Sequence, residues 1–173
     1  VYLRKGYGLN SFQLIKNSGI NVGLGTDTVP PDIINEMQTT SLLSKIKDDD
    51  NMSGNAREIY NSATLGGAKA LNRNDLGRLY KGCRADIVIL NISNIRTGLV
   101  DDPIRSLVYY SNSKDIKTVI INGKMILDNY KIIGLDEREL YNEAQNLWNK
   151  LKRKKLLNVK QSLNKNTFKM IRE

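Results

Sequence analysis

The most informative stretch of the chain is Asn21-Val22-Gly23-Leu24-Gly25-Thr26-Asp27. Its short apolar content predicts a buried β-strand over residues 21–26. The two glycines leave space for another backbone to pack closely beside this strand. Because the strand ends at Asp27, the sequence places a carboxylate at the carboxyl end of a buried strand.

Helices are predicted on both sides of this strand. Residues 11–18 carry apolar side chains three positions apart, which favours a short amphipathic helix that Gly19 ends. Pro30-Pro31 suits the first turn of a second helix, which runs to about Lys47. The predicted inner side of this helix holds Ile33, Met37 and Leu43. The first 47 residues are therefore predicted to fold as α-β-α.

The carboxylate of Asp27 has two interpretations. In (β/α)8 barrels, catalytic groups cluster at the carboxyl ends of the strands, where a carboxylate can bind a metal ion and accept a proton from water. An aspartate shortly before a helix can instead act as its N-cap and accept hydrogen bonds from the first backbone N–H groups. The chemistry of the residue alone leaves both interpretations open.

A further helical region is predicted after a polar connection. Asn55, with Glu58 three residues later, forms a capping-box pattern that predicts the start of a helix. Thr64 is expected to cap a second helical turn that runs to Leu71. Gly66-Gly67 within it is expected to allow close helix packing rather than to bind an anion.

The periodicity then changes to that of strands. A strand is predicted over residues 85–90, and a hairpin over 118–127 with a type I′ turn at Asn122-Gly123. Between them, residues 103–110 are expected to form one or two helical turns. The chain should therefore contain a small β unit.

A long C-terminal helix is predicted to begin after Asp136, with Glu139 at the capping-box position. Apolar residues recur along it at spacings of four, three and four: Leu140, Ala144, Leu147 and Leu151, with Tyr141 and Trp148 seven apart. Core packing is the expected reason for this stripe, and Trp148 is expected to pack between the helix and the rest of the protein.

The chain has no histidine and a single cysteine, Cys83. The absence of histidine excludes a Ser-His-Asp triad, a Cys-His pair and a His-based zinc helix within these 173 residues. One cysteine excludes an intrachain disulfide and a CxxC zinc site. No apolar run approaches the roughly 20 residues that span a bilayer, and no signal peptide is evident, so the cytoplasm is the expected location and no membrane partner is expected.

The net charge of +9 is concentrated at one end of the chain. Residues 150–173 contain nine basic and one acidic side chain, whereas residues 1–149 are nearly neutral. A basic terminal arm can bind an acidic partner or nucleic acid. A solvated terminus is the expected alternative, because the arm has a single aromatic residue and no stacking pattern, and nucleic acid is therefore not the expected partner.

Four segments, in this order, resemble the amidohydrolase superfamily, most closely its cytosine deaminase and chlorohydrolase-like branch. They are residues 24–27 with the helix that follows, residues 63–71, residues 77–89 (Gly77-Arg78-Leu79, then Lys81-Gly82-Cys83-Arg84-Ala85-Asp86-Ile87-Val88-Ile89) and residues 119–124. Each segment is weak evidence by itself, but four in family order are specific, and they cover roughly residues 1–130.

This resemblance implies an α/β fold: the last strand-helix units of a (β/α)8 barrel, the C-terminal part of a small β-sandwich and a C-terminal helix. The expected regions are residues 1–72 for the end of the barrel, 73–130 for the small β domain, and 131–173 for the helix and basic tail. The resemblance also implies a zinc or iron site in which Asp27 is a metal ligand and proton shuttle. The implied reaction is hydrolysis of a C–N or C–halide bond in a cyclic amidine-like or N-heterocyclic small molecule, most closely a deamination. No substrate-binding residue is assigned.

The histidine ligands that the resemblance implies are absent from this sequence. One carboxylate cannot hold a catalytic zinc, which takes three protein ligands and a water molecule. The chain is therefore expected to be the C-terminal portion of such an enzyme, to need the missing N-terminal part of the barrel, and to be inert and metal-free when isolated. A homo-oligomer is left open. The alternative is a non-catalytic module whose basic tail binds an acidic partner or nucleic acid.

Overall fold

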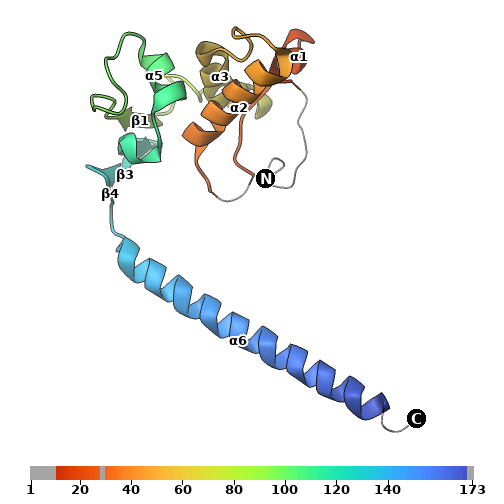
Figure 1. Ribbon diagram of the computed structural model, residues 1–173. Coiled ribbons are helices and arrows are strands. Elements are labelled where there is room, and N and C mark those ends of the chain that lie inside the picture. Colours follow the sequence, from red (N-terminus) through yellow and green to blue (C-terminus); the bar gives the residue numbers. More distant parts are fainter. Residues whose placement is uncertain (1–10, 28–29, 171–173) are drawn as a thin grey trace. The chain divides into compact units, whose positions relative to one another are not determined.

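The computed structural model describes residues 11–27 and 30–170 of the chain. The chain divides into two compact units, residues 1–131 and residues 132–173. The first unit contains short helices and a small sheet, and the second contains one long helix (Figure 1). The predicted regions 1–72 and 73–130 both fall in the first unit, and their division into separate domains stays a prediction.

Polar side chains begin the helices of the first unit. These helices are α1 (Phe12–Asn17), α2 (Ile33–Asp48), α3 (Ala56–Asn61), α4 (Gly67–Ala70) and α5 (Pro103–Tyr110). Ser11, Asp32 and Asn55 each accept backbone hydrogen bonds at the start of α1, α2 and α3. The predicted helices are confirmed, but Pro30-Pro31 lies before the cap of α2 rather than in its first turn.

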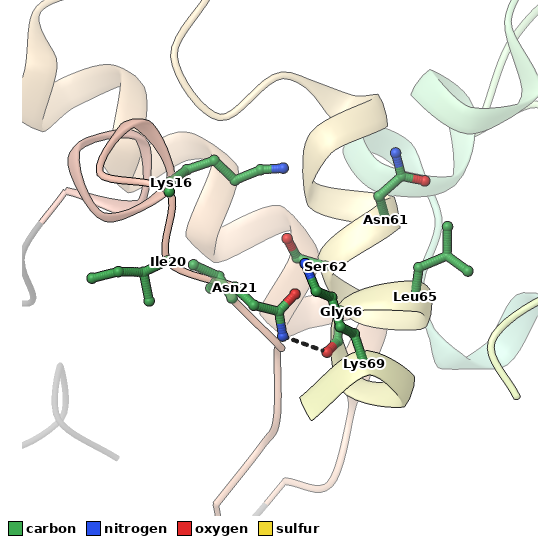
Figure 2. A pocket seen from close by; sticks show the side chains of 10 residues that line it. Lys16, Ile20, Asn21, Asn61, Ser62, Leu65, Gly66 and Lys69 are labelled. Atoms are coloured by element: carbon green, nitrogen blue, oxygen red, sulfur yellow. Dashed lines mark hydrogen bonds between the residues drawn. The ribbon is translucent and has the colours of Figure 1, made fainter. Parts of the chain in front are cut away.

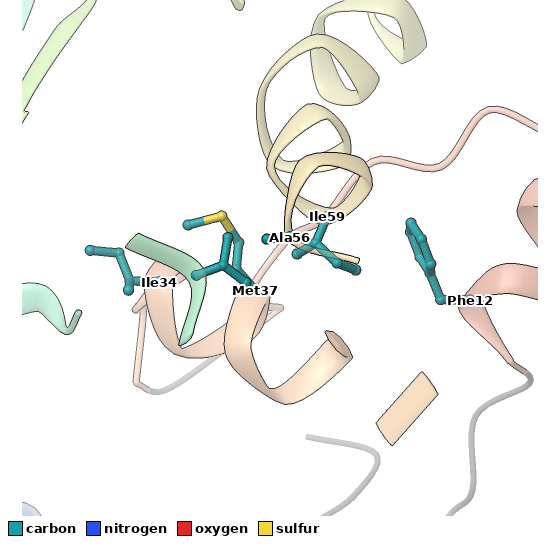
Figure 3. Close-up of a cluster of buried hydrophobic side chains, with 6 residues drawn as sticks. Phe12, Ile34, Met37, Ala56 and Ile59 are labelled. Atoms are coloured by element: carbon teal, nitrogen blue, oxygen red, sulfur yellow. The ribbon is translucent and has the colours of Figure 1, made fainter. Parts of the chain in front are cut away.

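The core of the first unit lies where these helices meet. Figure 3 shows Phe12 of α1, Ile34 and Met37 of α2, and Ala56 and Ile59 of α3 gathered around one apolar cluster. Val108 of α5 completes the cluster and, like Ile59, is fully buried. The cluster therefore ties together helices from both predicted regions of the unit.

α3 and α4 are joined by a wider π-helical turn, η2 (Ser62–Gly66). The Thr64 hydroxyl donates a hydrogen bond of 2.8 Å to the carbonyl oxygen of Tyr60, one turn earlier. The prediction that Thr64 caps a new helix is wrong, because the helical run continues through it and leaves no free helix start to cap.

A four-stranded sheet follows, in the order β1 (Ile87–Leu90), β2 (Ile116–Ile121), β3 (Lys124–Asp128) and β4 (Lys131–Ile132). β2 pairs with β1 and with β3, antiparallel in both cases. The turn between β2 and β3 has positive φ at both Asn122 (+50°) and Gly123 (+78°), as a type I′ turn requires. The predicted hairpin is confirmed.

An ion pair fastens the loop after β1 to the start of β2. The guanidinium of Arg96 donates to both carboxylate oxygens of Asp115 at 2.5 Å, and Asp115 is 7% exposed. Asp115 lies in η3 (Ser113–Asp115), a 3-10 turn that leads directly into β2. The backbone N–H of Asn91 also donates to the carbonyl of Asp115 at 2.8 Å. The loop after β1 and the turn before β2 are thus joined through one buried carboxylate.

Residues 20–27 do not form a strand, so the prediction of a buried strand over 21–26 is wrong for the structure described. Burial nevertheless alternates along the segment: Val22, Leu24 and Thr26 are half-buried, and the residues between them are exposed. A strand requires a neighbouring strand to share its backbone hydrogen bonds. Within the described residues, this segment forms hydrogen bonds with a helical turn instead of with a strand.

The second unit consists mainly of α6 (Glu137–Met170). The Asp136 carboxylate accepts hydrogen bonds from the backbone N–H groups of Arg138 at 2.9 Å and Glu139 at 3.0 Å, which confirms the predicted start. Within the described part of the chain, no helix combines the length and the apolar character needed to cross a bilayer.

The apolar stripe of α6 is not covered within its own unit. About half of the surface of Leu140, Leu147, Leu151 and Trp148 is exposed. The ammonium group of Lys152 lies 5.7 Å from the centre of the Trp148 ring, on the same helix. The described residues of this unit provide no second apolar surface for the stripe, so the packing of the stripe and of Trp148 against the rest of the protein stays a prediction.

Candidate functional site

Asp27 lies at the end of the extended segment, with its side chain exposed. Its backbone is left-handed, with φ of +60°. That conformation is uncommon for residues other than glycine, although aspartate tolerates it better than most. Such outliers cluster at functional sites, where the surrounding structure holds them in place.

The cap of α2 is Asp32 and not Asp27. The Asp32 side chain accepts hydrogen bonds from the backbone N–H groups of Ile34 and Asn35, both at 3.1 Å. The helix-cap interpretation of Asp27 is therefore wrong. A sequence signal for the true cap was present: Asp32 directly precedes the apolar pair that opens the helix and directly follows two prolines.

Two hydrogen bonds attach the segment before Asp27 to the helical run opposite it. The backbone N–H of Leu24 donates to the carbonyl of Ser62 at 3.1 Å. The Asn21 side-chain amide donates to the carbonyl of Gly66 at 2.9 Å. Both acceptors belong to η2, so the π-helical turn holds the segment that leads to Asp27.

Glycines allow the two backbones to approach this closely. A Cβ on Gly66 would lie 2.1 Å from the carbonyl oxygen of Val22, a distance that no side chain can occupy. A Cβ on Gly23 would lie 3.3 Å from the Cα of Gly67. The predicted close packing at Gly66-Gly67 is confirmed, and so is the space left by Gly23.

A cavity of about 300 Å³ lies beside this contact (Figure 2). In the view, Lys16, Ile20 and Asn21 approach it from one side, and residues of α3, η2 and α4 approach it from the other. Its lining includes two lysines, Lys16 and Lys69, and it does not include Asp27. No sequence pattern identified it, because its residues come from separate elements and follow no periodic order. The cavity is therefore distinct from the position of the predicted site residue.

Metal-ligating side chains are not grouped in the described part of the chain. Among the described residues, no group of three or more Cys, Asp or Glu side chains could hold a metal ion. The three adjacent aspartates at 48–50 are used locally: the Asp48 carboxylate accepts from the hydroxyls of Ser11 (2.6 Å) and Ser53 (2.5 Å). The hydrogen bond from Ser11, followed by that from Ser53, lowers the pKa of Asp48. The exposed Asp27 carboxylate has the donor chemistry that a divalent cation accepts, and alone it would supply one ligand.

Cys83 lies in a turn and is half-buried. Its thiol points to the carbonyl oxygen of Asn74 at 3.8 Å. Nothing in this geometry assigns it a catalytic role.

Relatives by sequence are deaminases. A 5-methylthioadenosine/S-adenosylhomocysteine deaminase of Pelotomaculum thermopropionicum is 37% identical over 132 residues, and a 5′-deoxyadenosine deaminase of Methanosarcina barkeri is 34% identical over 131 residues. These matches cover 74% and 73% of this chain. The chain spans about 30% of the length of either relative.

The solved structures that superpose on this chain include a deaminase and a chlorohydrolase. An adenosine deaminase from Xanthomonas campestris with bound zinc superposes with a TM-score of 0.83 at 25% identity, over 88% of this chain and 36% of the deaminase. An atrazine chlorohydrolase from Arthrobacter aurescens complexed with zinc superposes with a TM-score of 0.75 at 27% identity, over 84% of this chain and 34% of the chlorohydrolase. A sequence model of the amidohydrolase family matches residues 4–126. The chain therefore belongs to the amidohydrolase family.

Proposed function

We propose that the chain supplies the last part of a (β/α)8 barrel and the C-terminal part of a small β-sandwich. Residues 21–27 would become a barrel strand, with α2 as the helix that follows it. The alternating burial of Val22, Leu24 and Thr26 supports this assignment, because successive side chains of a strand point to opposite faces and one face of this segment is already partly covered. The sheet β1–β4 would belong to the sandwich.

The reaction proposed for the complete enzyme is hydrolysis of a C–N bond in an N-heterocyclic small molecule. The two relatives above are deaminases named for adenosine-type nucleosides, which supports a purine nucleoside as the substrate class. In such a deamination a water oxygen bonds to the ring carbon that carries the amino group, and the C–N bond breaks to release ammonia. A halide or an amine is the alternative leaving group, since a chlorohydrolase shares the fold.

Asp27 is the residue proposed to take part in this chemistry. The observation that supports this role is the geometry of the residue. The side chain is exposed, its backbone is left-handed, and the start of α2 does not use its carboxylate. One oxygen would bind a divalent zinc or iron, and the other would accept the proton of the attacking water. The metal would supply Lewis acidity, which lowers the pKa of a water molecule to about 7.

The remaining metal ligands are proposed to come from a polypeptide segment outside these 173 residues, because the chain contains no histidine. The isolated chain should then neither bind zinc tightly nor hydrolyse a nucleoside. Elemental analysis after gel filtration checks this, and an equimolar zinc content would contradict it.

The decisive experiment compares two aspartates in the longest reading frame that contains this chain. Ammonia release from adenosine, 5′-deoxyadenosine and 5-methylthioadenosine would be measured for the wild type, Asp27→Asn and Asp32→Asn. Asp27→Asn should lower turnover at least 10²–10⁴-fold, roughly the contribution of a general base, and should weaken metal retention. Asp32→Asn is the matched control: asparagine caps about as well as aspartate, so activity and melting temperature should barely change. Near-normal turnover of Asp27→Asn would remove the proposed role.

A non-catalytic module remains the second candidate, because residues 150–173 concentrate most of the net charge of the chain. In that case the basic tail would bind an acidic partner or nucleic acid. The DNA upstream of the codon for Val1 separates the two: an in-frame extension with a His-x-His strand supports the enzyme, and a start codon at this point supports the module. A cytoplasmic location stays a prediction under both.

A further inference from the structure

Six positions of α6 form a straight seam along one side of the helix. They are spaced by three, four, three, four and three residues, the pattern that keeps side chains on one face of a long helix. In order, they are Glu137, Leu140, Ala144, Leu147, Leu151 and Lys154. The seam therefore begins with an acid, ends with a base and is apolar between them.

The described residues of its own unit leave this seam uncovered. Glu137 and Lys154 are exposed, and about half of the surface of each of the three leucines is accessible. Trp148 and Tyr141 lie along one flank of the seam and are 56% and 67% exposed. Figure 1 shows α6 as a single unbroken helix through this stretch. An apolar strip of this length on an ordered helix calls for a partner surface.

The spacing of the seam is the same when read in either direction, which has a direct consequence for self-pairing. When a second α6 runs antiparallel, Glu137 lies opposite Lys154, Leu140 opposite Leu151, and Ala144 opposite Leu147. Every layer then joins either opposite charges or two apolar side chains, and the small alanine always meets a large leucine. The same layers recur after the two-fold rotation, as a self-complementary interface requires.

A parallel pair of the same helices has none of these advantages. In register, it would place Glu137 against Glu137, Lys154 against Lys154, and Ala144 against Ala144. The first two layers repel, and the third leaves a gap in the middle of the seam. The charges beside the seam follow the same rule: residues 136–143 carry four acidic side chains and one basic, whereas residues 150–155 carry five basic and none acidic.

We propose that α6 is a self-association element through which two copies of this chain pair antiparallel along the seam of residues 137–154. Glu143 and Lys150 flank the apolar layers. Glu143 of each copy would form an ion pair with Lys150 of the other copy. The inference concerns an interaction surface and does not depend on the reaction proposed above.

The charge pattern favours a second copy over an anionic membrane. A helix that lies on such a membrane carries Lys and Arg along the whole of its polar face. The first two turns of α6 carry Glu137, Glu139 and Glu143, which an anionic surface repels. An antiparallel helix of the same sequence offers basic groups to these acids and acidic groups to the basic end.

The first test places a charge in the centre of the seam. Sedimentation equilibrium of the full chain should show a reversible dimer at micromolar concentrations, and Leu147→Glu should raise its dissociation constant about 100-fold or more, because two buried leucines are lost per dimer. Asn149→Glu is the matched control: it adds the same charge on the opposite side of the helix and should leave the dissociation constant within about threefold. A wild-type chain that stays monomeric, or equal effects of the two variants, would overturn the proposal.

The second test addresses the antiparallel orientation. Glu137→Lys and Lys154→Glu should each weaken the dimer, since each places like charges in the two end layers, and the double variant should restore it. Glu139→Lys makes the same charge change in the first turn but off the seam, and should weaken the dimer less. Failure of the double variant to recover, or wild-type association that none of the seam variants changes, would show that another face pairs. A monomeric chain that co-sediments with phosphatidylserine vesicles would also overturn the proposal.

Discussion

Residues 21–27 and the β2–β3 hairpin are both extended, but their backbones are held in different ways. In the hairpin, β2 and β3 exchange backbone hydrogen bonds across a two-residue turn, in the register Ile121 with Lys124. The segment before Asp27 has its described hydrogen bonds with a helix: Leu24 N–H to Ser62, and the Asn21 amide to Gly66.

The difference shows what each region needs in order to keep its shape. The hairpin carries its partner next to it in sequence, so positive φ at two turn residues is sufficient to close it. The segment depends on a helical turn that is distant in sequence. Its backbone can come close to that turn because Gly66 has no side chain there. The position of Asp27 therefore depends on the contact between residues 21–24 and Gly66. Four substitutions or conditions should separate these two kinds of support, with effects that decrease in the order given.

The largest effect is expected at the helix–segment contact. Gly66→Ala would place a Cβ 2.1 Å from the Val22 carbonyl oxygen, so one backbone must move. We expect a loss of about 3 kcal/mol in the free energy of unfolding, at the upper end of the usual cost of overpacking. Urea denaturation followed by circular dichroism measures it. Gly67→Ala is the matched control: its Cβ would meet nothing within 4 Å, and alanine favours the helix. A control as destabilising as Gly66→Ala would contradict the steric account.

The hairpin should be less sensitive to a single methyl group. Gly123→Ala keeps open space around the new Cβ but forces alanine to adopt φ of +78°. The expected loss is about 1–2 kcal/mol, the usual cost of a left-handed residue, measured by the same denaturation. Gly25→Ala serves as the control, since Gly25 has neither a left-handed φ nor a close neighbour, and it should change stability little. An unchanged Gly123→Ala protein would show that the turn has relaxed to another type.

A smaller effect is expected from the Asn21 side chain, which anchors the segment. Asn21→Ala removes the 2.9 Å hydrogen bond to the Gly66 carbonyl, and should lower stability by about 1 kcal/mol. Asn17→Ala, which removes an exposed bond from Gln13 within α1, should cost less than half as much. Equal effects would mean that the Asn21 contact does not hold the segment.

The smallest effect is expected when the pH is lowered. It concerns the ion pair between Arg73 and Asp75, in the loop that leads to β1. The hydrogen bond from the Arg73 guanidinium lowers the pKa of the exposed Asp75 carboxyl to about 2. Because the folded pKa lies below the unfolded value, the stability from this pair is present above about pH 4 and is lost as the pH falls towards about 2. The urea midpoint should decline slightly over that range, and Asp75→Asn should flatten part of the decline. A decline of the same size in Asp75→Asn would assign it to other carboxylates, such as Asp48.

Features set by neighbouring residues could be predicted from the sequence. The caps at Asn55 and Asp136, the helix over Pro103–Tyr110 and the Asn122-Gly123 turn each depend on side chains within four residues, and all are present. The close backbone contact at Gly66 was also predictable, since a Gly-Gly pair in a helix favours close packing.

Features set by distant partners could not be predicted. Residues 21–26 have the composition of a strand, but pairing depends on other strands and not on composition. The stripe on α6 has the periodicity of a buried face, yet periodicity does not say what covers it. For the site, the sequence identified Asp27 as a candidate, and the geometry of Asp32 removed the cap interpretation, for which the sequence also held a signal.

The π-helical turn that receives the segment also affects the order in which this chain folds. The bond from Asn21 to Gly66 joins residues 45 apart, whereas the hairpin closes over two, and the entropy lost on closing a loop grows with its length. A hairpin forms in about 1–10 μs, so β2 and β3 can pair before the segment finds its helix. By the same reasoning the segment should be the first to detach in local opening. Its Leu24 amide proton should therefore exchange with solvent sooner than those of β2, and the exchange rate at that single atom would report how often the position of Asp27 is assembled.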